Sequence, residues 1–118
     1  MMLKTNSRFV GGVAVLDCSG RIVFGEESSA LRDVVDKLRA ENQRIVLNLG
    51  GVSYIDSGGL GTLVALYTTA KKNGTTIKLA KLSQRVGDLM QVTKLLTVFE
   101  VYDGEAQALK SFERGTAA

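Results

Sequence analysis

Patterns typical of strands and of helices alternate along this chain, and this alternation restricts the possible folds more than any other feature. Residues 44–49 form a short apolar run of buried-strand type, and apolar residues then recur at helical spacing over residues 60–70. Residues 76–80 again alternate like a strand, and residues 82–93 again show helical spacing. Strands that alternate with helices predict an α/β domain with a mostly parallel sheet and crossover helices between its strands.

The two ends of the chain add further elements to this pattern. Residues 8–10 and 13–18 predict two strands joined by a turn at Gly11-Gly12, which we expect to pair antiparallel at one edge of the sheet. The other expected elements are a short strand at 22–24, a helix over 31–38 with an acidic start at 25–29, a helix stop at Asn73-Gly74, a strand at 98–102 and a final helix capped by Asp103. With no proline and no low-complexity segment to mark a linker, residues 1–118 are expected to form one domain.

Composition and charge exclude several classes of partner. The chain is 45% hydrophobic and 23% charged, which is typical of a globular domain, and its net charge of +3 is spread along the sequence. Direct nucleic-acid binding would need a concentrated basic stripe with stacking aromatics, and aromatics make up only 6% of the residues. No apolar run approaches the roughly 20 residues of a membrane span, and Gly11-Gly12 and Asp17 argue against a signal peptide or a lipoprotein site before Cys18. We expect a cytoplasmic protein without nucleic-acid or membrane partners.

The residue types present also limit the chemistry. The chain has no histidine and one cysteine, which excludes a Ser-His-Asp triad, a histidine zinc site and a thiolate cluster. A nucleophile elbow around Ser57 would need glycine where Ile55 stands, and Lys71-Lys72 lies several helical turns away as a base. No phosphate loop and no complete dinucleotide fingerprint occurs. We therefore expect no enzyme activity, no cofactor and no metal.

Residues 55–61, which run Ile-Asp-Ser-Gly-Gly-Leu-Gly, lie where the strand pattern changes to the helix pattern. A hydroxyl at such a helix start faces outward beside free N–H groups and the positive end of the helix dipole, where a phosphate would find donors. The simplest structural interpretation is that Asp56 or Ser57 caps the helix. Gly58 and Gly59 would let another backbone approach closely, and one of them is a candidate for a positive φ angle.

The string from Val52 to Leu63 resembles the signature of the STAS domain, and more narrowly that of bacterial anti-sigma factor antagonists. The similarity is wider than the motif, because residues 15–22 resemble the family's second strand and turn, and residues 79–83 resemble its strand leading into the third helix. It spans about residues 8–112. The resemblance implies a small, mixed, mostly parallel sheet of about four to five strands with about four helices packed on one side.

The resemblance also implies a non-enzymatic binding module that works by partner switching. Ser57 stands at the family's phosphorylation site. The unmodified protein would bind an anti-sigma factor with serine kinase activity and free a sigma factor, phosphorylation of Ser57 would release the kinase, and a serine phosphatase would reset the cycle. The protein itself is expected to be a monomer or a weak dimer. The expected partner-binding residues are Asp56, Ser57, Gly58, Gly59, Leu60 and Gly61.

Two departures from the family pattern bear on the partner. Gly58 stands where the family often has a second hydroxyl, and Arg21-Ile22-Val23 follows Gly20 where acidic residues are usual. If that turn contacts the kinase, the partner here differs from the better-known ones. Two alternatives remain open: a STAS scaffold or accessory subunit in another signalling or transport assembly, and a small-molecule or nucleotide sensor that uses the helix start at Ser57 as an anion site.

Overall fold

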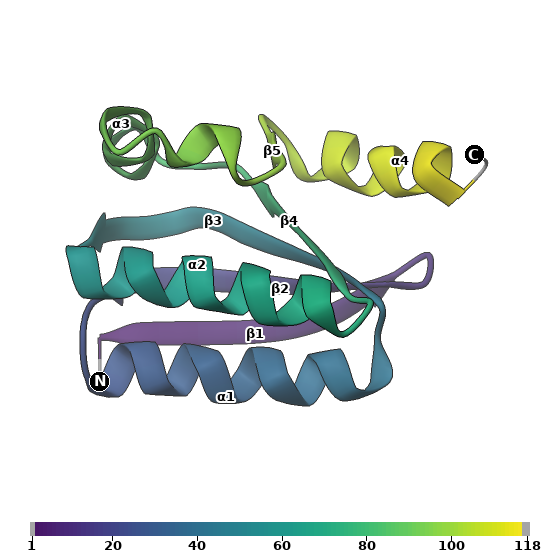
Figure 1. The fold of residues 1–118 in the computed structure, drawn as a ribbon, viewed down its shortest axis with the longest axis horizontal. Helices are drawn as coiled ribbons and strands as arrows, with labels where there is room; N and C mark the ends of the chain where they lie inside the picture. The colour runs from purple at the N-terminus through teal and green to yellow at the C-terminus, as the bar shows by residue number, and fades with distance from the viewer. Residues whose placement is uncertain (1, 117–118) are drawn as a thin grey trace.

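The computed structural model describes the backbone of residues 2–116 and the side chains of residues 2–113. The chain forms a five-stranded sheet with helices packed against both of its faces. Figure 1 shows how these elements are arranged. In chain order the elements are β1 (Leu3–Val10), β2 (Val13–Ile22), α1 (Glu26–Glu41), β3 (Arg44–Ile55), α2 (Ser57–Lys72), β4 (Thr76–Ala80), α3 (Gln84–Val92), the 3-10 helix η1 (Leu95–Thr97), β5 (Val101–Tyr102) and α4 (Glu105–Thr116).

The strand order is β1-β2-β3-β4-β5, with β1 antiparallel to β2 and all other neighbours parallel. Gly11 and Gly12 have φ angles of +55° and +81°, which suits the tight turn of the β1–β2 hairpin. The expected mixed, mostly parallel sheet is therefore confirmed. The expected strand at 22–24 is not separate: Ile22 ends β2, and Gly25, with φ +103°, turns the chain into α1.

Two apolar cores lie on opposite faces of the sheet because side chains alternate along its central strands. On β2, Ala14 and Leu16 belong to the core beneath α1, α2 and α3, whereas Val13 and Val15 belong to a second core. Ala108 and Phe112 of α4 close that second core. The expectation that all helices pack on one side is thus correct for three helices and wrong for α4, since the central strands are apolar on both faces and both must be covered.

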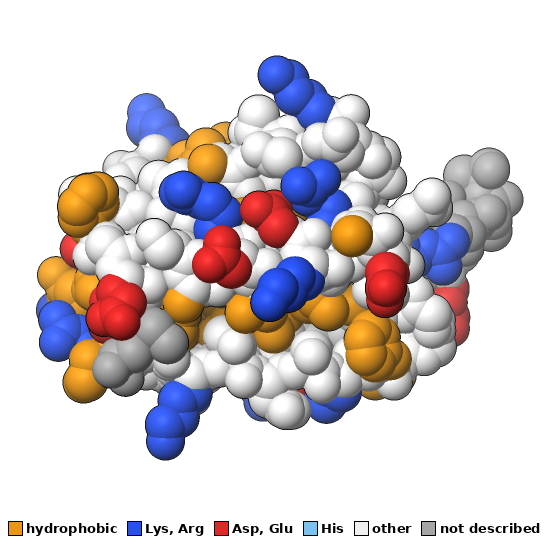
Figure 2. Space-filling model, turned by 90° about the horizontal axis from the view of Figure 1, so that it is seen from below, with side chains coloured by type: hydrophobic (Ala, Val, Ile, Leu, Met, Phe, Trp, Pro, Cys, Tyr) orange, Lys and Arg blue, Asp and Glu red, His pale blue; other side chains and the backbone are white. Residues whose placement is uncertain are grey.

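Strand β3 is longer than its apolar run predicts, and this extension positions the start of α2. Asn48 is the last β3 residue paired with β4, but β3 continues along β2 until Ile55 pairs with Ile22. The final helix begins at Glu105, two residues after Asp103. Figure 2, which views the molecule from the α1 side, shows basic and acidic side chains interspersed on that surface. Among the helices of residues 2–116, none is long and apolar enough to cross a membrane.

Candidate functional site

The junction between β3 and α2 places Ser57 on the surface at the carboxyl end of the sheet's central strands, where open α/β sheets commonly carry their sites. Ser57 is the first residue of α2 and is exposed. Asp56 is the N-cap: its backbone is extended, and its Oδ1 accepts a hydrogen bond from the Gly59 N–H at 2.7 Å. Asp56 is therefore the cap of α2, and the Ser57 hydroxyl does not serve as one.

Asp56 also ties the start of α2 to the end of β2. Both of its carboxylate oxygens lie 3.1 Å from the backbone nitrogen of Phe24, and its own N–H donates to the Ile22 carbonyl at 3.3 Å. The N–H groups of Gly59 and then Phe24 hold the pKa of this carboxyl below its usual range. Ser57 consequently has a fixed negative charge next to it, the Asp56 carboxylate, which is hydrogen-bonded to backbone N–H groups.

The two glycines after Ser57 are required by close packing. A Cβ built on Gly59 would overlap the carbonyl group of Ile22, whose carbon would be 2.8 Å away, and a Cβ on Gly58 would lie 2.6 Å from Cβ of Phe24. The predicted close approach of another backbone is confirmed. The expectation of a positive φ at one of these glycines is wrong, because both already lie in the first turn of α2; the positive-φ glycines are Gly11, Gly12, Gly20, Gly25 and Gly74.

The structure distributes the other predicted site residues between surface and interior. Gly61 is exposed with open space beside it, whereas Leu60 is only 6% exposed and belongs to the core beneath α2. Gly59 is buried, and Gly58 and Asp56 are half-buried. A partner that approaches this edge can contact Ser57 and Gly61 directly. Gly59 and Leu60 instead pack against the interior and hold the first turn of α2 on the sheet.

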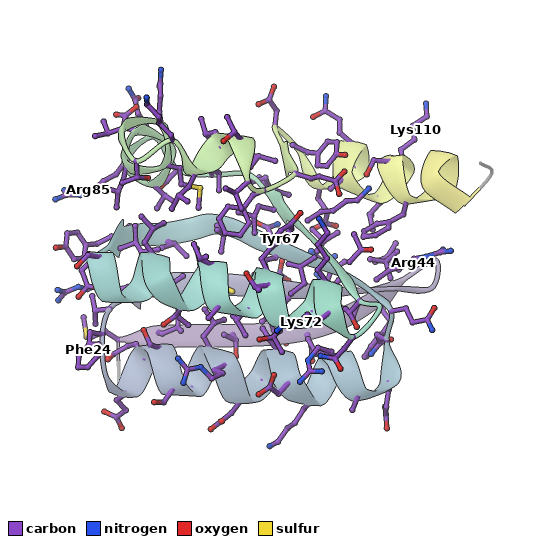
Figure 3. The ribbon with its side chains drawn as sticks, in the orientation of Figure 1. Phe24, Arg44, Tyr67, Lys72, Arg85 and Lys110 are labelled. Atoms are coloured by element: carbon purple, nitrogen blue, oxygen red, sulfur yellow. The ribbon has the colours of Figure 1, made fainter. Side chains whose placement is uncertain are left out.

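Phe24, Tyr54 and Arg85, which the sequence analysis missed, share this end of the molecule with Arg21. Phe24 is 81% exposed and lies against Gly58. The ring of Tyr54 has the guanidinium carbons of Arg21 and Arg85 at 5.2 Å and 5.0 Å from its centroid. Figure 3 shows Phe24 and Arg85 at the end where α2 begins, with Lys110 at the other end. The only signal for this group in the sequence was the basic residue after Gly20, because nothing local relates α3 to Tyr54.

The surroundings of Ser57 lack the groups that would make it a nucleophile. Asp56 is bound to backbone donors, and the chain has no histidine to act as a base. Within the described residues, no three Asp, Glu, Cys or His side chains gather closely enough to hold a metal ion. What the arrangement offers is an accessible hydroxyl that a separate protein, an enzyme, could modify.

Comparison with known proteins agrees with this geometry. The anti-sigma F factor antagonist of Paenibacillus polymyxa is 27% identical over 115 residues, which cover 96% of this chain and 97% of that protein. The anti-sigma-B factor antagonist of Staphylococcus aureus is 33% identical over 75 residues, 63% of this chain and 69% of that protein. An anti-sigma factor antagonist from Mycobacterium paratuberculosis has the same fold, with a TM-score of 0.81 at 24% identity and 92% coverage of each chain. The family model described as the STAS domain matches residues 4–108, so this chain belongs to the STAS domain family.

Proposed function

We propose that this protein is an anti-sigma factor antagonist controlled by phosphorylation. In its unmodified form it binds an anti-sigma factor that has serine kinase activity, and this binding frees a sigma factor. Phosphorylation of Ser57 ends the binding, and a serine phosphatase restores the active form. The observation that carries the proposal is the exposed Ser57 at the first position of α2 beside the fixed carboxylate of Asp56. The names of the relatives that match most of the chain support the same function.

The proposed switch works because phosphorylation affects the free protein and the complex differently. A phosphoserine carries about −1.5 to −2 charges near neutral pH. At the start of α2 the helix dipole favours such a charge, so the free fold tolerates it. In a docked interface the same phosphate would be desolvated beside the negative charge of Asp56, which opposes binding. Phosphorylation would therefore change the stability of the free protein little but weaken the binding of the partner strongly.

Ser57 is also the best placed hydroxyl in its neighbourhood. Thr62 is 4% exposed, and its Oγ1 donates to the Gly58 carbonyl at 3.0 Å. Ser53 is exposed, but its hydroxyl donates to the Gly20 carbonyl at 3.2 Å. No hydrogen bond ties Ser57 Oγ to another of the described side chains or to their backbone. A kinase that docks at this edge would therefore reach Ser57 with the least rearrangement.

The test is a phosphorylation assay with the anti-sigma factor kinases encoded in the same genome. The full chain is incubated with each kinase and Mg·ATP, and phosphopeptides are mapped by mass spectrometry. We expect one phosphate, on Ser57; Ser57→Ala should bind the kinase without being modified, and the matched control Ser53→Ala should be modified normally. Phosphate found only on Ser53 or Thr62 would refute the site, and failure of every kinase to bind the unmodified chain would refute the function.

A further inference from the structure

Three residues from separate elements form an aromatic and basic cluster next to the Ser57 edge. Tyr54 lies near the end of β3, Arg21 is its direct partner on β2, and Arg85 is in the first turn of α3. The guanidinium carbons of Arg21 and Arg85 lie 5.2 Å and 5.0 Å from the centroid of the tyrosine ring, within the range of cation–π attraction. We call these residues the arginine–tyrosine patch. Because Ile22 and Ile55, the next paired residues, lead directly to Asp56, the patch borders the candidate site.

The arginines of the patch are available to a partner. Both are exposed, and within residues 2–113 neither guanidinium forms an ion pair with a carboxylate. Asp56 accepts hydrogen bonds from backbone N–H groups. Glu27 accepts one from the backbone nitrogen of Met2 at 3.0 Å; this N–H and, less strongly, the charge of Arg21 lower the pKa of Glu27, but Glu27 and Arg21 form no ion pair. Stacking on Tyr54 orients the two guanidiniums but leaves their N–H donors open.

We propose that the arginine–tyrosine patch is a second contact surface for the anti-sigma factor and that it receives an acidic segment of that partner. Carboxylates of the segment would pair bidentately with the two guanidiniums, which is the geometry that arginine favours. The exposed ring of Phe24, which lies against Gly58, would enter an apolar pocket of the same partner. This inference rests on the proposed function and adds the chemistry of the partner's surface.

A protein fits this patch better than a nucleic acid does. Tyrosine, phenylalanine and arginine are the residues enriched at the centres of protein–protein interfaces. A nucleic acid would need a longer track of cations along its backbone. The patch holds two guanidiniums and one ring, and basic side chains on the adjoining α1 surface alternate with acidic ones (Figure 2).

The experiment measures binding of the full chain to its anti-sigma factor by calorimetry at low and high salt. We expect Arg21→Glu/Arg85→Glu to bind at least about tenfold more weakly, since juxtaposed like charges at an interface are strongly unfavourable. The affinity of the unaltered protein should fall with salt, and that of Arg21→Gln/Arg85→Gln should fall less. Lys72→Glu/Lys110→Glu, which makes the same change in net charge away from the start of α2, is the matched control and should bind normally (Figure 3). Thermal melts verify that each variant is folded. If the glutamate variant does not fold, the binding of the glutamine variant tests the inference instead.

Each outcome separates this inference from the proposed function. Weaker binding by the patch variants, restored when the acidic segment of the partner is changed to lysine, supports the inference. Equal binding by the folded patch variants overturns it and leaves the proposed function intact. It is also overturned if the patch variants lose affinity for a single-stranded oligonucleotide but not for the anti-sigma factor. If the unaltered chain binds no anti-sigma factor, the proposed function fails and the inference fails with it.

Discussion

At the scale of single residues, Asp56 links the fold to the proposed switch. Its carboxylate accepts from Gly59 inside α2 and from Phe24 after β2, so one side chain fixes both the start of the helix and the loop that packs against it. Those donors keep it ionised, because they lower its pKa. Any charge placed on Ser57 therefore meets a neighbour that is already negative and cannot easily move away.

This arrangement predicts that Ser57→Asp folds normally but binds its anti-sigma factor more weakly. A carboxylate at the first position of a helix is neutral or favourable by a few tenths to about 1 kcal/mol, so the melting temperature should hardly change. In the complex it adds a second negative charge beside Asp56. Calorimetry should give at least about tenfold weaker binding. Ser53→Asp adds the same charge away from the helix start and should bind more tightly than Ser57→Asp; equal affinity of Ser57→Asp and the unaltered protein would contradict the electrostatic switch.

The glycines of α2 allow a second comparison at this scale. In Gly59→Ala the new Cβ overlaps the Ile22 carbonyl, so α2 must move away from β2, and overpacking of this kind costs on the order of 1–3 kcal/mol. Gly61 has open space around it, and Gly61→Ala should stabilise the helix by about 0.5–1 kcal/mol. Urea unfolding of both variants measures the difference. If Gly59→Ala were as stable as Gly61→Ala, close packing would not be the reason for the glycine.

At the scale of elements, a polar network attaches α4 to the first three strands. Arg8 on β1 binds Asp17 on β2, with N–O distances of 2.7 and 2.9 Å, and also the carboxylate of Glu105 at the start of α4. Asn48 on β3 donates to Glu105 at 3.2 Å. The guanidinium of Arg8 lowers the pKa of both Asp17 and Glu105. The start of α4 is thus held by ionised carboxylates, whereas its later turns pack through Ala108 and Phe112.

This network predicts that acid loosens the attachment of α4 to the sheet. Because the folded pKa values of Asp17 and Glu105 lie below the unfolded values of about 4, their contribution is complete above pH ~4 and is lost as the pH falls through the lowered values. Amide hydrogen exchange should show α4 opening more readily on acidification. In Arg8→Gln this acid-dependent step should disappear, while Arg39→Gln, which removes a pair within α1, should retain it. Equal acid sensitivity in Arg8→Gln would contradict the role of the network.

The same scale shows which elements the sequence could predict. The β1–β2 hairpin, β4 and a helix cap at Asp56 or Ser57 follow from local signals, namely two glycines in a turn, strict alternation, and a capping residue before an apolar stripe. The structure decides between the two residues in favour of Asp56. The end of β3 could not be predicted, because Gly50-Gly51 interrupts its apolar run and only pairing with β2 makes it a strand. The placement of α4 and the contact of Arg85 with Tyr54 are likewise long-range features without a local pattern.

At the scale of the whole molecule, the two cores share β2, β3 and β4, so neither can be lost without affecting the other. This sharing predicts a single cooperative unfolding transition. Stability and partner binding need not change together, however. The core beneath α2 supports the Ser57 edge directly, whereas the core beneath α4 lies on the opposite face of the sheet and is joined to that edge only through the strands (Figure 1).

Two cavity-forming variants test this separation. Leu60 is 6% exposed and Phe112 is 5% exposed, so Leu60→Ala should cost about 2–5 kcal/mol and Phe112→Ala about 3–5 kcal/mol of unfolding free energy. Both should melt in one transition at lower temperature. Below that temperature, Phe112→Ala should bind the anti-sigma factor like the unaltered protein, because the sheet still holds α2 in place. Leu60→Ala should bind more weakly, since the first turn of α2 loses the contact that seats Ser57. Equal binding by both variants would mean that the core does not position the serine, and the surface of the helix start alone would then account for recognition.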